Sequence, residues 1–142
     1  MPYNPYNLRN QRWGEALVAG AGPLTNLFIA VFFGLLIRFG ILFGIVSVAS
    51  PFVELTKFIV YINILLALFN LIPIPPLDGS KVLASILPYQ AHRKYMDFQA
   101  LMMRYGMFAM FAFFLLFIYF LWPIFQTIIL FLFSLIAGIG FF

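Results

Sequence analysis

The sequence contains no cysteine and very little charge. The absence of cysteine excludes disulfide bonds and metal sites built from thiolates. Charged side chains make up 8% of the 142 residues, against about a quarter in a soluble domain. Hydrophobic residues make up 65%, and twenty of the residues are phenylalanine. A chain of this composition cannot cover a globule with polar groups, so we expect the lipid bilayer to be its solvent.

Patterns that carry chemistry are also scarce. His92 is the only histidine, and the chain has neither a Gly-x-Ser-x-Gly turn nor a glycine-rich phosphate loop. The formal net charge is +4, but the basic residues are scattered at the ends of apolar segments, where they act as interface anchors. We therefore expect no nucleic-acid partner.

Long apolar runs dominate what is present. Residues 17–37 and 55–72 each approach the roughly 20 residues that a bilayer core requires. A third run covers residues 107–122 and is followed by a proline, which breaks or kinks it. Residues 123–142 are apolar to the end and are a candidate fourth span. The predicted fold is all-α: one polytopic integral membrane domain over residues 1–142, with three to four transmembrane helices.

Two shorter segments connect these runs. Residues 39–52 are apolar but short for a span, which leaves a helix extension, a re-entrant piece or an interfacial segment. Residues 89–104 are amphipathic and basic, the pattern of a helix that lies in the membrane interface. We interpret His92, beside Arg93 and Lys94, as a solvated residue of that helix rather than as a ligand.

The stretch NLIPIPPLDG, residues 70–79, ends the second run. Proline removes a backbone donor and clashes with the preceding turn, so the helix must stop or kink there. The sequence that follows, up to Pro88, predicts a short new helix with Asp78 as its N-cap. The expected architecture is thus a proline-broken helix at this motif.

Asp78 and Asn70 flank this break. A charge at membrane depth costs about 2.5 kcal/mol or more and is usually paired or functional. Irregular backbone in a membrane is buried in protein or lines a watery cavity. Both arguments place Asp78 at a cavity; the alternative is a surface turn in which Asp78 only caps the next helix. Asn70 either presents its amide to a ligand or holds neighbouring helices together.

Three stretches carry a resemblance to a known family. They are NPYNLRNQRWGEALVAGAGPLTN (residues 4–26), NLIPIPPLDGSKVL (70–83) and RYGMF (104–108). Together they resemble the site-2 protease family, the membrane-embedded zinc metalloproteases of peptidase family M50. The second stretch is similar to its N-x-x-P-x-x-x-L-D-G motif. The match covers essentially the whole chain in the right order and implies a multi-pass protein, of a prokaryotic cell membrane.

The resemblance implies roles for two residues. In that family, zinc is held by two histidines of an H-E-x-x-H helix and by the aspartate of the LDG motif, which here is Asp78. Asn70 matches the asparagine of the motif, which is thought to help position substrate or the backbone of the active site. The implied cofactor is Zn²⁺, the implied substrate is a membrane-associated polypeptide, and the implied reaction is intramembrane proteolysis.

The sequence departs from the family pattern at one point, because it contains no H-E-x-x-H. Two zinc ligands and the general base are missing, and we assign no catalytic residue within the chain. We interpret it as the C-terminal core of a site-2-protease-like peptidase, incomplete and inactive by itself, or as a degenerate homologue. The alternative function is a non-catalytic membrane scaffold or a transporter-like component that binds an ion or partner at the broken helix.

Overall fold

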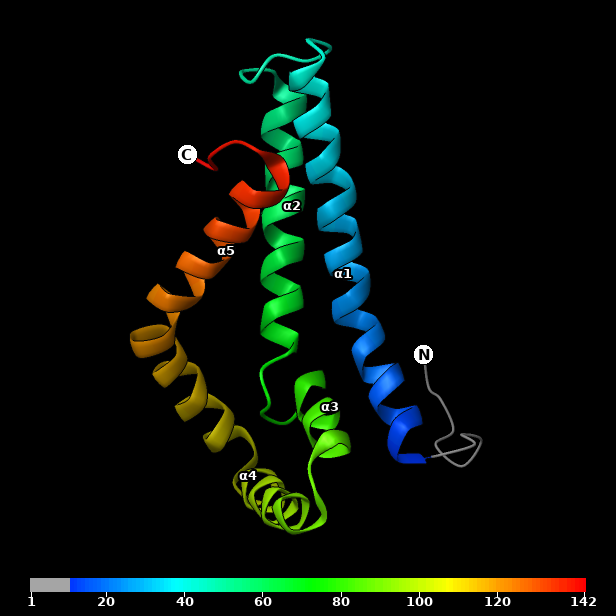
Figure 1. Ribbon diagram of the computed structural model, residues 1–142. Coiled ribbons are helices and arrows are strands. Elements are labelled where there is room, and N and C mark those ends of the chain that lie inside the picture. Colours follow the sequence, from blue (N-terminus) through cyan, green and yellow to red (C-terminus); the bar gives the residue numbers. More distant parts are fainter. Residues whose placement is uncertain (1–10) are drawn as a thin grey trace. The chain divides into compact units, whose positions relative to one another are not determined.

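The structure of this chain, a computed structural model, describes residues 11–142, which form helices joined by short turns (Figure 1). Its elements are α1 (Gln11–Leu42), α2 (Pro51–Asn70), α3 (Asp78–Ile86), α4 (Tyr89–Leu116), the π-helix η2 (Phe117–Leu121) and α5 (Trp122–Ala137). Within these residues there is no β-strand. The predicted all-α fold is confirmed.

Three helical stretches of the described part are long and apolar enough to cross a membrane: Trp13–Leu42, Pro51–Asn70 and Tyr89–Ala137. The prediction of a polytopic membrane protein is therefore confirmed, with three such stretches. Residues 123–137 do not form a separate fourth one. η2 joins α4 to α5 without a loop, and Pro123 directly follows this π-helical turn and does not end the helix.

The segment between the first two spans is in part a helix extension. α1 continues to Leu42, and the chain then turns before Pro51 begins α2. In this turn the carbonyl of Gly40 accepts hydrogen bonds from the backbone N–H groups of Ile45 and Val46, at 2.8 and 3.1 Å. The turn closes close to the end of α1, so residues 39–52 do not add a further span.

α4 contains a break of its own at Gly106. This residue has φ 49° and ψ −122°, outside the helical region and strained for any residue with a side chain. The break separates the amphipathic residues 89–105 from the apolar residues that follow. The glycine of the RYG stretch is thus required by the backbone, at the place where the sequence predicted the third apolar run to begin.

The helices form two compact units. The first comprises the described residues up to Pro23 together with Leu68–Leu115, and the second comprises Leu24–Ala67 and Leu116–Phe142. In the second unit, Gly34 of α1 allows α5 to come close, since a Cβ atom there would lie 2.5 Å from Cγ2 of Ile136. Small residues at a helix contact are typical of membrane proteins. The fully buried side chains of this unit include Ile37, Val53, Val60, Ile64, Ile129 and Phe133.

The charges inside the apolar runs of the second unit have partners. Lys57 is buried, and its Nζ lies 3.0 Å from Oε1 of Glu54. Nη1 of Arg38 donates to the carbonyl oxygen of Leu135 at 2.8 Å. A charge that leaves water needs such compensation. Glu54 therefore neutralises a buried lysine.

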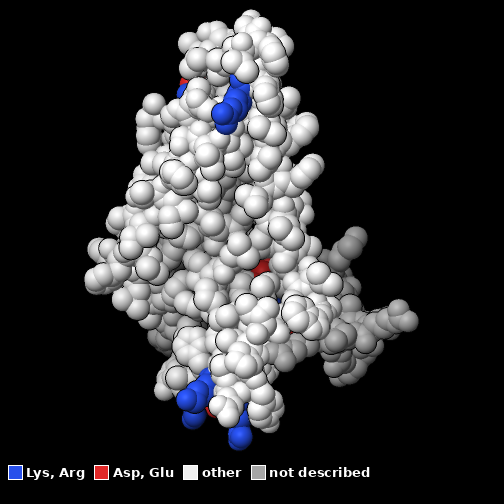
Figure 2. All heavy atoms as spheres, in the orientation of Figure 1, with Lys and Arg blue, Asp and Glu red and all other residues white. Residues whose placement is uncertain are grey.

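The outer surface is overwhelmingly apolar. Figure 2 shows a face that is nearly free of charge, with lysine and arginine side chains in a few small groups. Large side chains such as Phe28, Phe111 and Tyr119 are 70%, 64% and 76% exposed. Soluble monomers rarely expose apolar surface on this scale. The arrangement agrees with a lipid surround for the three long helical stretches.

Candidate functional site

The candidate site lies in the first unit, at the break between α2 and α3. α2 ends at Asn70 and α3 begins at Asp78, so the predicted break is confirmed. The last turn of α2 tightens, with the N–H of Leu71 bonded to the carbonyl of Leu68 at 3.2 Å. Across the loop, the N–H of Leu77 bonds to the carbonyl of Ile74 at 2.9 Å. The seven residues between the helices therefore form an ordered turn.

Asp78 does not cap α3, and that expectation is wrong. The N-cap residue is Leu77, which has an extended backbone and provides no side-chain cap. A side chain caps a helix from the position before the first helical residue, and Asp78 is already helical. Its carboxylate therefore accepts no capping hydrogen bond from the backbone N–H groups of α3.

Gly79 is required by space. A Cβ atom at this position would overlap the carbonyl group of Leu71 and lie 2.7 Å from the carbonyl oxygen of Ile72. Its φ is not positive, so the conformational freedom of glycine is not the reason. The loop backbone crosses directly over the start of α3, and only a residue without a side chain permits this. The glycine of the LDG motif thus brings the loop against the residue that follows Asp78.

The Asp78 carboxylate faces α1. Asp78 is half-buried, and a Cβ atom built on Gly22 would lie 3.5 Å from its Oδ2. Among the described residues, no hydrogen bond or ion pair involves the side chain of Asp78. Gly22 therefore leaves the space in front of this carboxylate clear of any side chain of its own. By contrast, a Cβ atom on Gly20 would meet nothing within 4 Å.

Asn70 is half-buried in the last turn before the break. Another asparagine of the same helix, Asn63, donates its amide to the carbonyl of Ile59 at 2.8 Å. No such bond is formed by the amide of Asn70 within the described part of the chain. Its predicted roles, substrate binding or contact between helices, stay predictions.

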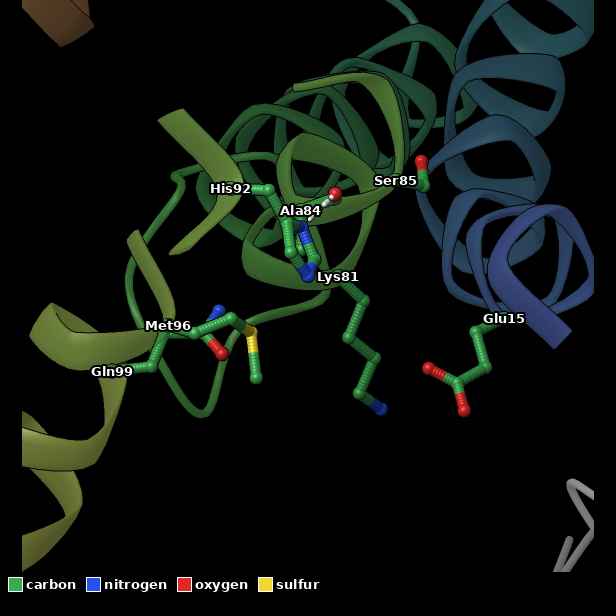
Figure 3. Close-up of a pocket in the computed structure, with 7 residues that line it drawn as sticks. All are labelled: Glu15, Lys81, Ala84, Ser85, His92, Met96 and Gln99. Atoms are coloured by element: carbon green, nitrogen blue, oxygen red, sulfur yellow. Dashed lines mark hydrogen bonds between the residues drawn. The ribbon is translucent and has the colours of Figure 1, made fainter. Parts of the chain in front are cut away.

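A pocket of about 340 Å³ with polar and apolar lining residues adjoins α3 (Figure 3). Glu15 and Lys81 point toward one another in this view, and His92 lies against Ala84. Glu15 and Gly22 are seven residues apart on α1, and Asp78 and Lys81 are three apart on α3. These spacings place the pocket and the Asp78 carboxylate along the same pair of helix faces. The remaining lining residues are Ala84, Ser85, Met96 and Gln99.

The sequence suggested that His92 is a solvated residue, but it is not freely solvated in the structure. It is half-buried, and its Nδ1 lies 2.7 Å from the carbonyl oxygen of Ala84. A carbonyl oxygen can only accept, so Nδ1 must carry the hydrogen. The imidazole thereby connects α4 to α3. The sequence offered no signal for this contact, because the two residues lie on different helices.

Asp78 is suited to bind a metal ion as a single ligand. Its carboxylate offers oxygen donors, has no described partner and faces a glycine. Zinc sites use three or four protein ligands. Within residues 11–142, no group of three histidine, cysteine, aspartate or glutamate side chains is placed to share a metal. Asp78 therefore fits one position of a zinc site, and the described residues do not complete it.

Known proteins match the part of the chain that contains this break. The family model described as Peptidase family M50 matches residues 38–113, which include both Asn70 and Asp78. Residues 4–10 of the first stretch that resembles the family lie outside the described residues. No solved structure matches the chain.

Two curated proteins are similar in sequence. "Putative zinc metalloprotease YwhC" of Bacillus subtilis is 32% identical over 91 residues, which is 62% of this chain and 42% of that protein. "Putative zinc metalloprotease MJ0611" of Methanocaldococcus jannaschii is 45% identical over 67 residues, which is 46% of this chain and 31% of that protein. The aligned part thus spans less than half the length of either relative.

The contact between Gly22 and Asp78 predicts a specific cross-link. A Cβ atom at position 22 would lie 3.5 Å from Oδ2 of Asp78, so side chains at these two positions meet, and a disulfide needs its two Cβ atoms about 3.8 Å apart. The double variant Gly22→Cys/Asp78→Cys should form an intramolecular disulfide under mild oxidation, seen as a faster-migrating band on a non-reducing gel. The chain has no other cysteine, so the two introduced thiols have no competing partner. The control, Gly20→Cys/Asp78→Cys, should form it far more slowly; equal rates would contradict the arrangement.

Proposed function

Because the chain belongs to peptidase family M50, we propose that it is part of a membrane-embedded zinc metalloendopeptidase in which Asp78 is one of the zinc ligands. The single observation that carries this proposal is the setting of Asp78. The carboxylate follows a proline-rich break, lacks a described partner and faces the open position of Gly22. A half-buried charge without compensation in an apolar protein is a functional residue by default.

Each residue of the site would contribute a definite part. Asp78 would bind the metal through a carboxylate oxygen and help to neutralise its charge. Zinc, when bound, would lower the pKa of a water molecule and polarise the peptide carbonyl. Gly79 keeps the loop against the start of α3 and so fixes the place from which the Asp78 side chain extends. None of these parts requires a second charged group from the described residues.

Asn70 would hold the substrate. A peptide bond inside a transmembrane helix is protected by its own hydrogen bonds, so a substrate must be unwound near the site of cleavage. The extended segment then exposes N–H and C=O groups that need partners in a membrane. The Asn70 amide can both donate and accept, and it lies on the last turn before the break. We therefore assign it to the backbone of a membrane-associated polypeptide.

The remaining zinc ligands and the general base would come from residues outside this sequence. The chain has a single histidine, so it cannot supply both histidines of an H-E-x-x-H motif. The aligned part of the chain covers 42% and 31% of the two curated relatives. These facts support a zinc site shared between this chain and an H-E-x-x-H helix that the 142 residues do not contain. A bilayer of a prokaryotic cell is the setting we propose, since the relatives come from a bacterium and an archaeon.

The first prediction of this proposal concerns the chain by itself. One carboxylate cannot hold a catalytic zinc, so the purified 142-residue chain in detergent should bind zinc weakly and cleave no membrane-associated polypeptide. Zinc content after dialysis and cleavage of a labelled transmembrane peptide measure this. Zinc-dependent proteolysis by this chain would contradict the shared site.

The second prediction concerns Asp78 in a longer protein that carries both this sequence and an upstream H-E-x-x-H segment. Asp78→Asn should lower zinc affinity by about 100-fold or more, since even outer-shell partners of a metal contribute about 10–100-fold. Metal analysis and peptidase assays provide the readout. The matched control is Asp97→Asn, which removes the other aspartate, on the exposed surface of α4. Unchanged zinc content and activity in Asp78→Asn would remove Asp78 from the ligand set.

The third prediction concerns Asn70. Asn70→Ala in the same longer protein should lower kcat/KM by about tenfold, the effect of one lost hydrogen bond, and leave the zinc content unchanged. Asn63→Ala is the control, because the Asn63 amide is already bonded within α2. Steady-state cleavage assays with a fluorogenic peptide would separate the two. If Asn70→Ala and Asn63→Ala behave alike, Asn70 does not bind the substrate.

A further inference from the structure

The first turns of α4 hold the loop and α3 through three side chains. The hydroxyl of Tyr95 donates to the carbonyl oxygen of Pro73 at 2.8 Å. Nδ1 of His92 lies 2.7 Å from the carbonyl oxygen of Ala84, and Nε2 of Gln99 donates to that of Ser80 at 3.4 Å. All three acceptors are backbone carbonyls, so these contacts fix the course of the main chain around the candidate site.

These three residues share one face of α4. Their spacing of three and then four residues is the spacing of neighbours along one side of a helix. Arg93 and Lys94, in contrast, are exposed. The polar pattern of this segment therefore has two sources: basic residues that face outward, and a row of hydrogen-bonding residues that faces the loop and α3.

The loop has a shortage of donors that Tyr95 relieves. Three of its seven residues are prolines, which have no N–H group. The N–H of Leu77 bonds to Ile74 and that of Ile74 bonds to Ile72, so neither of them serves the carbonyl of Pro73. The phenol of Tyr95 supplies this donor from another helix. Without it, the middle of the loop would lose a hydrogen bond that its own sequence cannot replace.

We propose that Tyr95, supported by Gln99 and His92, is the positioning residue for the Asp78 carboxylate. Asp78 lies between two of the carbonyls that α4 holds, five residues after Pro73 and two residues before Ser80. Loop and helix are thus fixed on both sides of it. The catalytic meaning of this role rests on the proposed function, but the geometric role does not require zinc.

A carboxyl NMR signal tests the proposal directly. The chain contains only two aspartates, so Asp97→Asn leaves Asp78 as the single source of a ¹³Cγ-aspartate signal. In this background and in lipid nanodiscs without metal, Tyr95→Phe should shift or split the Asp78 signal. Amide hydrogen exchange of Leu71–Leu77 should become about tenfold faster, the effect of one lost hydrogen bond.

The matched control is Tyr89→Phe. It makes the same chemical change on the same helix, at a side chain that is 78% exposed. It should change neither readout. Gln99→Ala is the second variant, and it should shift the Asp78 signal in a chain that keeps the Tyr95 bond. It serves if Tyr95→Phe loses its fold.

Three results would overturn the proposal: an unchanged Asp78 signal with unchanged loop exchange in both Tyr95→Phe and Gln99→Ala, the same changes in Tyr89→Phe, or a uniform loss of amide protection over all helices. The last would mean a general role in stability. Because no zinc is present, the outcome is independent of whether Asp78→Asn releases zinc from the longer protein. In that longer protein, the positioning role predicts for Tyr95→Phe a fall in kcat with unchanged KM.

Discussion

The rest of this site depends on one constraint, the loss of helical hydrogen-bond donors at Pro73, Pro75 and Pro76. The backbone carbonyls that these donors would have served need other partners. In a chain that is 65% hydrophobic, such groups cannot rely on water and must find partners within the protein. The tightened turn at the end of α2 and the bond from Leu77 to Ile74 satisfy part of this need. Tyr95 satisfies another part from a different helix. The break in the second span therefore requires α3 and α4 to be folded against it.

The sequence predicted what depends on local chemistry. Prolines end α2, apolar length defines three spans, and α3 stops before Pro88. The predictions from the sequence were wrong where a residue's role depends on a contact with a distant segment. Asp78 was expected to cap α3, because aspartate after a turn favours that role, yet it is already helical. His92 was expected to be solvated, because its neighbours along the chain are basic, yet it is bonded to Ala84. A single sequence does not show which helices meet.

Three glycines show how one residue type serves different constraints. Gly106 is needed for its positive φ, where α4 breaks between its amphipathic and apolar parts. Gly79 has an ordinary φ and is needed because the Leu71 carbonyl occupies the place of a side chain. Gly22 leaves the front of the Asp78 carboxylate clear. The sequence could predict that these positions lie at breaks or contacts, but only coordinates distinguish conformational freedom from space.

The same contacts that make the break stable also determine what a metal ion would gain there. A carboxylate that is half-buried, unpaired and fixed by its backbone has already lost much of its hydration and side-chain freedom before any ligand arrives. A cation would then be bound by a preorganised oxygen donor and would relieve the uncompensated charge. The loop, Gly79 and the hydrogen bonds from α4 offset the free energy that an unpaired Asp78 carboxylate costs in this setting. Removal of one hydrogen bond from α4 should therefore weaken metal binding by the Asp78 carboxylate, although the removed group does not contact that carboxylate. This outcome distinguishes a positioned ligand from a carboxylate at the end of a flexible turn.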